Sequence, residues 1–346
     1  MSWTRTPRQQ TRAMFRFMLC ATMLAGLSVC ATMASASAAT EKPQSPIRGT
    51  SFTLRNSLSA LSLTPAADAT YNPYSASTFG FNANWWFNQT FYFNGALDVA
   101  HEWTMADDVN HQSELVLGDA LISLGGNRLW TVPWVGIGLS ADLALVLPTS
   151  KRSQAETLWF TASPSVRISR DFENLFDVVK GLSLSYAFKP SKSFHSYTTS
   201  SYQGPTIPDC RSSVTGCEAF LHNGLRNVSW SIGNSAGAEL TVLDWLSFDA
   251  GFAVYVGFLY PLSSQSSVSY AVADPVNERY VDVYSIGVNF MPTRYLVLSV
   301  GSSTANQPRK PDQSLREPIF NRYTQLFVDL RLSTAGLLDQ LTQADE

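Results

Sequence analysis

The sequence is poor in charged residues and in long hydrophobic runs. Charged residues make up 15% of its 346 positions, well below the usual quarter. No block rich in Lys and Arg is present, which argues against a nucleic-acid partner. Beyond the N-terminus, no uncharged apolar run reaches the ~18 residues of a transmembrane helix, which argues against a helical membrane protein. Aromatic residues reach 12%, and this supply of apolar surface argues against disorder.

Cysteine is also scarce, with only four in the chain. Cys20 and Cys30 lie in an N-terminal segment that we expect to be removed. Cys210 and Cys217 remain, close together in a polar stretch, and an even pair in an exported chain predicts one short-loop disulfide. A metal site is disfavoured because only His222 lies nearby and no second pair of ligands follows. We therefore expect no metal and no cofactor.

The first 38 residues have the layout of a secretory signal peptide. Met1–Arg16 is basic, Phe17–Met33 is apolar, and a run of small residues with A-x-A spacing begins at Ala34. This order of regions is the one that signal peptidase recognises. Glycine and hydroxyl residues interrupt the apolar region, which disfavours a membrane anchor. We expect cleavage of residues 1–38, followed by a short periplasmic lead-in over 39–48.

Two kinds of residue alternate in the most informative stretch, Trp134–Leu147. Every second residue from Val135 onward is apolar, whereas the intervening residues are small and include Asp142. Successive side chains of a strand point to opposite faces, so one face of this strand is apolar and the other is small and polar. A soluble strand usually has about 5–6 residues, whereas a tilted membrane-spanning strand needs roughly 9–11. The length therefore favours a strand that spans a membrane.

The same alternation recurs through the mature chain. It is clear in Leu246–Tyr260 and Tyr323–Leu332, and weakest in Gly49–Leu63, where leucines break any regular period. Short connections alternate with long polar ones, which is typical of an outer-membrane barrel. Because lipid cannot satisfy a sheet edge, such strands must close on themselves. Counting Gly49–Leu63 gives about twelve strands, an even number with both ends in the periplasm. A secreted soluble β-sandwich or barrel is the alternative.

On these features the chain resembles the outer-membrane β-barrel superfamily of Gram-negative bacteria. The resemblance rests on architecture, because no residue motif points to a subfamily. It implies an all-β chain in the outer membrane, with one closed antiparallel barrel over 49–332, short periplasmic turns and longer extracellular loops. Outer-membrane lipid, lipopolysaccharide and the barrel-assembly machinery are the implied partners. Such barrels often end on an aromatic residue, whereas this last strand ends at Leu332 and a periplasmic tail over 333–346 follows.

The inward-facing charged residues are the candidate functional set. The alternation places ten of them opposite the apolar face: Asp98, Glu102, Asp119, Asp142, Arg167, Lys189, Glu239, Asp249, Asp329 and Arg331. A lumen with excess carboxylate favours cations. We therefore predict a passive channel for small solutes with a modest cation preference. The alternative is a closed structural or surface-interaction barrel, filled by its own side chains, whose long loop Pro190–Asn227 binds a partner.

A third hypothesis is an outer-membrane lipid hydrolase. His111 and Ser113 form a His-x-Ser pair, in which histidine would act as the base and serine as the nucleophile. The pair sits where a loop enters a strand and lacks the Asn and Gly context of such enzymes, so we expect no enzymatic activity. His101, near a strand end on the outer face, is interpreted as an interfacial residue.

Overall fold

The computed structural model describes residues 45–63, 74–104, 113–176, 179–202, 221–261, 277–310 and 312–338. The expected signal segment 1–38, His111 and the cysteine pair Cys210 and Cys217 lie outside these ranges, so what the sequence indicates for them stays a prediction. No helix among the described residues is both long and apolar enough to cross a membrane.

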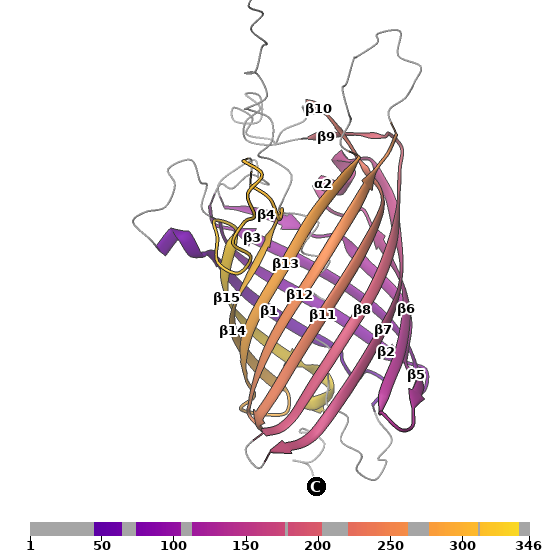
Figure 1. Ribbon diagram of the computed structural model, residues 1–346, viewed down its shortest axis with the longest axis vertical. Helices are drawn as coiled ribbons and strands as arrows, with labels where there is room; N and C mark the ends of the chain where they lie inside the picture. Colours follow the sequence, from indigo (N-terminus) through magenta and orange to yellow (C-terminus); the bar gives the residue numbers. More distant parts are fainter. Residues whose placement is uncertain are drawn as a thin grey trace, which may run out of the picture.

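Twelve antiparallel strands form a closed barrel (Figure 1). They are β1 (Ser51–Ser59), β2 (Ser75–Trp86), β3 (Phe91–Glu102), β5 (Ala120–Val132), β6 (Ile137–Leu147), β7 (Leu158–Phe176), β8 (Val179–His195), β11 (Val228–Leu243), β12 (Leu246–Leu259), β13 (Glu278–Phe290), β14 (Leu296–Asn306) and β15 (Thr324–Ser333). β1 pairs with both β2 and β15 and so closes the sheet. The predicted antiparallel barrel of about twelve strands is confirmed, and the weakly patterned stretch near its start supplies the closing strand.

The strand ends that the longer connections join lie at one end of the barrel together with short accessory elements, and short turns lie at the other end (Figure 1). The accessory elements are the single 3-10 turn η1 (Ala60–Leu63), strand β4 (Glu114–Leu117), helix α2 (Lys151–Ala155), and strands β9 (Thr199–Tyr202) and β10 (Leu221–Arg226), which pair with each other. Residues 334–338, in the predicted tail, form one helical turn beside the short-turn end. We refer to the two ends as the loop end and the turn end.

Three local details differ from what the sequence alone predicts. The alternation over 112–125 predicts one continuous strand, but the strand is interrupted at Gly118–Asp119, which separates β4 from β5. The polar residues over 170–181 predict a turn, but the segment is mostly strand, because apolar and charged residues continue to alternate there and extend β7 to Phe176. Pro164 predicts a bulge, but it pairs with Leu143 of β6 in an unshifted register. Its missing N–H removes a donor without displacing the strand.

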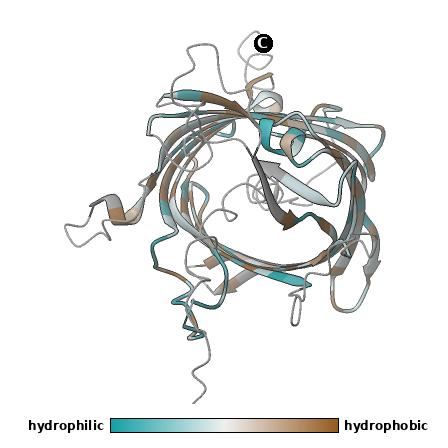
Figure 2. Cartoon of the chain, turned by 90° about the horizontal axis from the view of Figure 1, so that it is seen from above, coloured by the Kyte–Doolittle hydropathy of each residue, from teal (hydrophilic) through white to brown (hydrophobic). Residues whose placement is uncertain are grey.

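The two faces of the barrel wall differ in side-chain size and polarity. Large apolar residues on the outer face each expose more than a third of their surface, including Leu54, Phe79, Phe93, Leu143, Ile168, Phe188, Phe248, Val300 and Val328. Trp85, Trp103 and Trp230 lie near strand ends and expose 51%, 49% and 53%. A closed barrel that carries such an apolar belt is suited to lipid, because water would penalise the exposed surface. Viewed from above, the strands form a ring (Figure 2).

Candidate functional site: the barrel lumen

All ten charged residues predicted to line the lumen lie on the inner side of the wall or at its rim. Nine are in barrel strands, on the face opposite the exposed apolar residues, as with Asp142 beside Leu143 and Asp249 beside Phe248. The tenth, Asp119, lies in the break between β4 and β5. The alternation of side chains along each strand, with a period of two residues, thus determines whether a side chain points inward or outward. That these residues line a conducting path remains a prediction.

One group of inner charges lies where β15 meets β1. Asp329 is 4% exposed and faces Arg55 across the strand pair. Arg55 Nε donates to Asp329 Oδ1 at 2.7 Å, and Arg55 Nη2 donates to Oδ2 at 2.5 Å. This bidentate geometry is the strongest form of an arginine–carboxylate pair. The Arg55 guanidinium also lies over the Phe327 ring, 4.5 Å from its centroid. Asp329 therefore contributes little free negative charge to the lumen.

The carboxylates of β11 and β12 extend this group. Glu239 and Asp249 are register partners on the two strands. Asn289 Nδ2 donates to Asp249 Oδ1 at 2.8 Å. Arg331 interacts electrostatically with both carboxylates and with Asp329. Since Asp329 already has its own arginine, two carboxylates share Arg331, and this part of the wall is net negative.

The charge balance is reversed on β6, β7 and β8. Asp142 accepts a hydrogen bond from Ser165 Oγ at 2.5 Å. Lys189 interacts electrostatically with Asp142, and Arg167 and Asp142 both interact with the Tyr92 hydroxyl. One carboxylate is thus accompanied by two cationic groups. The excess of carboxylate that the sequence predicts is therefore unevenly distributed, and the lumen carries patches of both signs.

Acidic residues gather again toward the loop end. Asp98 and Asp119 are close enough to interact electrostatically. Glu102 is 3% exposed and faces Glu114 in the β3–β4 register. Lys151 forms an ion pair with Glu114. This side of the mouth carries four carboxylates and Lys151, an acidic excess that attracts cations. Elsewhere at the loop end, Arg279 interacts electrostatically with Glu156, Arg152 and Arg226, which adds positive charge to the rim.

Helix α2 and the β9–β10 hairpin lie over the mouth at the loop end, within the ring seen from above (Figure 2). Asp119 Oδ1 accepts from the backbone N–H of Ser150, the N-cap of α2, at 2.9 Å. At the other end of the helix, Asn227 is 2% exposed, and its Nδ2 donates to the carbonyls of Glu156 and Tyr197 at 2.9 Å each. These bonds hold both ends of α2 at the rim, near the start of β5 at one end and near the start of β11 at the other.

The sequence analysis missed several inner charges, among them Arg55, Arg128 and Asp171. Arg55 lies in the strand whose period was least regular. Arg128 and Asp171 form an ion pair at 2.6 Å, and their side chains are 50% and 45% exposed. Arg128 lies in a bulge of β5 with a φ of +47°, and Asp171 lies in the segment expected to be a turn. In the sequence, the alternation of Asp171 with the apolar Phe172 was the one feature that indicated an inward-facing Asp171.

A histidine–serine pair lies on the outer face at the loop end. His101 Nε2 is 2.8 Å from Ser113 Oγ, so the serine predicted to act with His111 has a different histidine beside it. The His101 ring lies 4.1 Å from the Trp103 ring, and Ser113 has a φ of +64°. Within the described ranges, no side chain hydrogen-bonds to Nδ1 of His101, and no group of three metal-ligating residues occurs.

No family model and no curated protein matches the sequence. Among solved structures, the COG4313 outer membrane channel from Pseudomonas putida F1 matches 85% of this chain and 100% of that chain, with a TM-score of 0.50 and 9% identity. This chain has the fold of an outer-membrane β-barrel. The predicted resemblance to that superfamily is thereby confirmed at the level of fold, and it accounts for the apolar belt and the closed edges.

Two further barrels also match this chain, with lower TM-scores. The KdgM porin covers 82% of this chain and 98% of its own, with 8% identity and a TM-score of 0.38. LpxR from Salmonella typhimurium covers 82% and 99%, with 11% identity and a TM-score of 0.37. Scores this low say nothing about the activity of this chain.

Proposed function

We propose that this protein is a passive outer-membrane channel for small hydrophilic solutes. The observation that carries the proposal is a band of glycine and serine on the inner face, in continuous register across neighbouring strands β6 to β14. Its members are Gly138, Ser169, Ser185, Gly237, Gly251, Ser285 and Ser303. We call it the Gly–Ser band. Side chains this small leave room for water in a lumen enclosed by twelve strands, whereas small barrels are filled by their own side chains.

The distribution of charge supports a modest cation preference. Acidic residues gather at the loop end around Asp98 and Asp119, and again on β11 and β12 around Glu239. The cationic patch at Arg167 and Lys189 opposes them. The resulting selectivity is weak, since paired charges such as Arg55 and Asp329 cancel within the wall. Screening at high salt reduces it further.

Single-channel recording of the full mature chain in a planar bilayer tests this proposal. We expect discrete conductance steps from the native protein. Ser185→Trp places an indole in the Gly–Ser band and should lower the conductance, whereas Leu240→Trp on the lipid-facing side of β11 should leave it unchanged. Absence of conductance at every voltage, from protein shown to be folded, would reject the channel and favour the closed surface-interaction barrel.

A second candidate function is ester hydrolysis at the outer face, and the His101–Ser113 contact favours it. A base within hydrogen-bond reach of a hydroxyl is the minimum needed to activate a serine nucleophile. Both residues lie at the loop end of β3 and β4, where lipid esters would approach. Hydrolysis of a short-chain lipid ester in mixed micelles tests this function. Ser113→Ala should abolish it and Ser77→Ala, a neighbouring outer-face serine, should not; equal activity in both variants removes the candidate.

A further inference from the structure

The connection between β14 and β15, residues 307–323, packs against the outside of the barrel. Thr304, Asn306 and Thr324 point outward on their strands, yet each is only 1% exposed. Thr304 Oγ1 donates to the carbonyl of Ile319 at 2.6 Å and lies 2.7 Å from Thr324 Oγ1. In Figure 1 this connection is the yellow loop beside β13 and β14. Because these outward-pointing residues are buried, the loop must cover them and so forms part of the outer wall.

The same connection is internally fixed and presents apolar side chains outward. Ser314 donates through its N–H at 3.0 Å and its hydroxyl at 2.6 Å to Asp312 Oδ1, and these bonds lower the pKa of the Asp312 carboxyl. Leu315, Ile319 and Phe320 expose 74%, 52% and 53% of their surface. Apolar side chains this exposed, beside a lipid-facing wall, are suited to contact with lipid.

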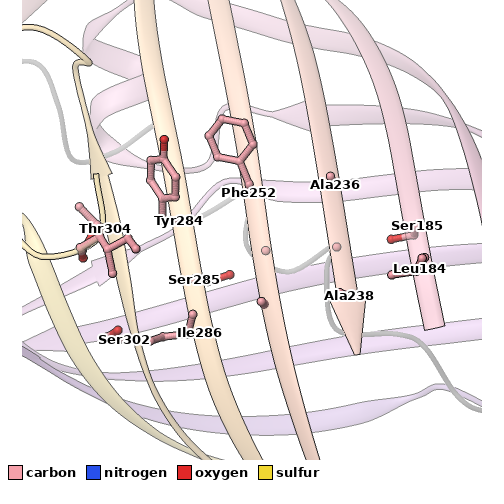
Figure 3. Close-up of a pocket in the computed structure, with 14 residues that line it drawn as sticks. Leu184, Ser185, Ala236, Ala238, Phe252, Tyr284, Ser285, Ile286, Ser302 and Thr304 are labelled. Atoms are coloured by element: carbon pink, nitrogen blue, oxygen red, sulfur yellow. The ribbon is translucent and has the colours of Figure 1, made fainter. Parts of the chain in front are cut away.

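Next to this loop, an apolar groove of about 520 Å³ runs across the outer face of β8 and β11 to β14. The small residues Ala236 and Ala238 line it, with the larger Phe252 and Ile286 beside them (Figure 3). Ala250, the register partner of Ala238, also lines the groove. The depression exists because alanine occupies positions that carry bulky residues on most other strands. Its volume is in the range of pockets that hold small ligands.

A polar pocket of about 380 Å³ adjoins the groove, and Tyr284 lines both. Asp282, Asn306, Arg316 and Glu317 line the polar pocket. Asp282 and Asn306 are register partners on β13 and β14. The Asn306 Oδ1 atom is buried, and none of the residues that the structure describes donates a hydrogen bond to it. A buried acceptor without a donor costs about 1–3 kcal/mol, so the pocket is suited to a ligand that supplies one.

We propose that the pocket and groove together bind a phospholipid that carries a primary ammonium group. Its ammonium would donate to Asn306 Oδ1 and to the Asp282 carboxylate, and its phosphodiester would lie at the Arg316 guanidinium. One acyl chain would occupy the groove. The polar pocket offers acceptors and one cationic donor side by side, which matches a zwitterionic headgroup better than an anionic one. The apolar extension beside it matches a hydrocarbon chain better than a soluble amine.

Native mass spectrometry of the full mature chain, released from nanodiscs of defined composition, tests the assignment. With equal phosphatidylethanolamine and phosphatidylglycerol, we expect one retained lipid per barrel, with the ammonium lipid favoured about tenfold. Asn306→Leu should remove that preference. Ala238→Trp should abolish retention by filling the groove, while Ala83→Trp on the outer face of β2 should have no effect.

Several results would overturn the assignment. Equal retention of the two lipids, preferential retention of the anionic lipid, or displacement by lipopolysaccharide would contradict the ammonium site. A dimer that Ala238→Trp disrupts would show instead that the groove is an interface between copies. If Asn306→Leu fails to fold, Asp282→Asn provides the second variant, and a lipid preference unchanged in Asp282→Asn would also reject the site.

Discussion

The inner and outer faces of the wall from β8 to β15 are made by the same strands, yet they differ in chemistry. The inner face carries the Gly–Ser band flanked by charged patches, and the outer face carries bulky apolar side chains interrupted by one groove. Asp329 on the inner face has a bidentate arginine, while Asp282 on the outer face lies beside an unpartnered amide oxygen. Strand alternation sets which face a residue occupies, and register sets which partners it meets there.

The largest expected difference between the two faces is the loss of stability when an arginine is replaced by alanine. Arg55→Ala should lower the free energy of unfolding by about 3–5 kcal/mol, because the buried Asp329 carboxylate loses both hydrogen bonds from its bidentate partner. Arg170→Ala removes only an outer cation–π contact with Phe172 and should cost less than about 1 kcal/mol. Urea unfolding in lipid vesicles measures both. Equal losses of unfolding free energy in the two variants would show that the Arg55–Asp329 pair stabilises the barrel no more than the outer contact does.

Introducing a charged residue should destabilise the barrel more on the outer face than on the inner face. Val300 is 51% exposed on the outer face of β14. Val300→Arg should destabilise the barrel by about 2–4 kcal/mol if this position lies near the bilayer centre. Ser303→Arg, which points inward from the same strand, should cost much less because water solvates it. The same unfolding assay compares the two, and a larger loss for Ser303→Arg would contradict the assignment of faces.

At the loop end, the amide of Asn227 should limit ion flow by holding α2. Asn227→Ala removes both hydrogen bonds to Glu156 and Tyr197, so the mouth should widen and single-channel conductance should rise by a factor below about two. Asn289→Ala, which removes an amide from the turn-end part of the lumen, serves as a comparison within the barrel. A conductance that is unchanged in Asn227→Ala would show that α2 does not constrict the path.

The smallest expected effect is on ion selectivity. Asp98→Asn should shift the reversal potential toward lower cation preference, and Lys189→Gln should shift it toward higher preference, because the two groups have opposite charge. Both shifts should shrink at high salt as the charges are screened. Reversal potentials under a salt gradient measure them. Shifts of the same sign in the two variants would contradict a lumen path past both residues.

The fold could be predicted from the sequence because the pattern that indicates it, the alternation of apolar and polar residues, is local. Alternation identified inward residues such as Asp142 and Asp249, and the parity of strands required a first strand even where Leu54 and Leu58 obscured the period. Closure by β1 follows from lipid chemistry, which forbids open edges. The break at Gly118 could not be predicted, since nothing in the neighbouring residues opposes a continuous strand.

The partners of the inner residues could not be predicted from local pattern. Arg55 and Asp329 are 274 positions apart in the chain, and only barrel closure brings them together. The charge balance of the lumen therefore changed once register was known. The outer groove was missed for the same reason, because alanines on β11 and β12 form a depression only when the strands are aligned. His101 and Ser113 are closer in sequence. Their contact depends on the pairing of β3 with the short strand β4, and the break between β4 and β5 was not predicted.

Cysteine scanning along β11 tests most directly whether one face of the wall meets water and the other lipid. Single cysteines from Ser231 to Glu239, in a background with Cys210 and Cys217 replaced by serine, would be treated with a charged, membrane-impermeant thiosulfonate in lipid vesicles. A water-filled lumen predicts rapid labelling at 231, 233, 235, 237 and 239 and little at the positions between them. Uniform labelling, or protection of the inward set, would contradict a hydrated lumen.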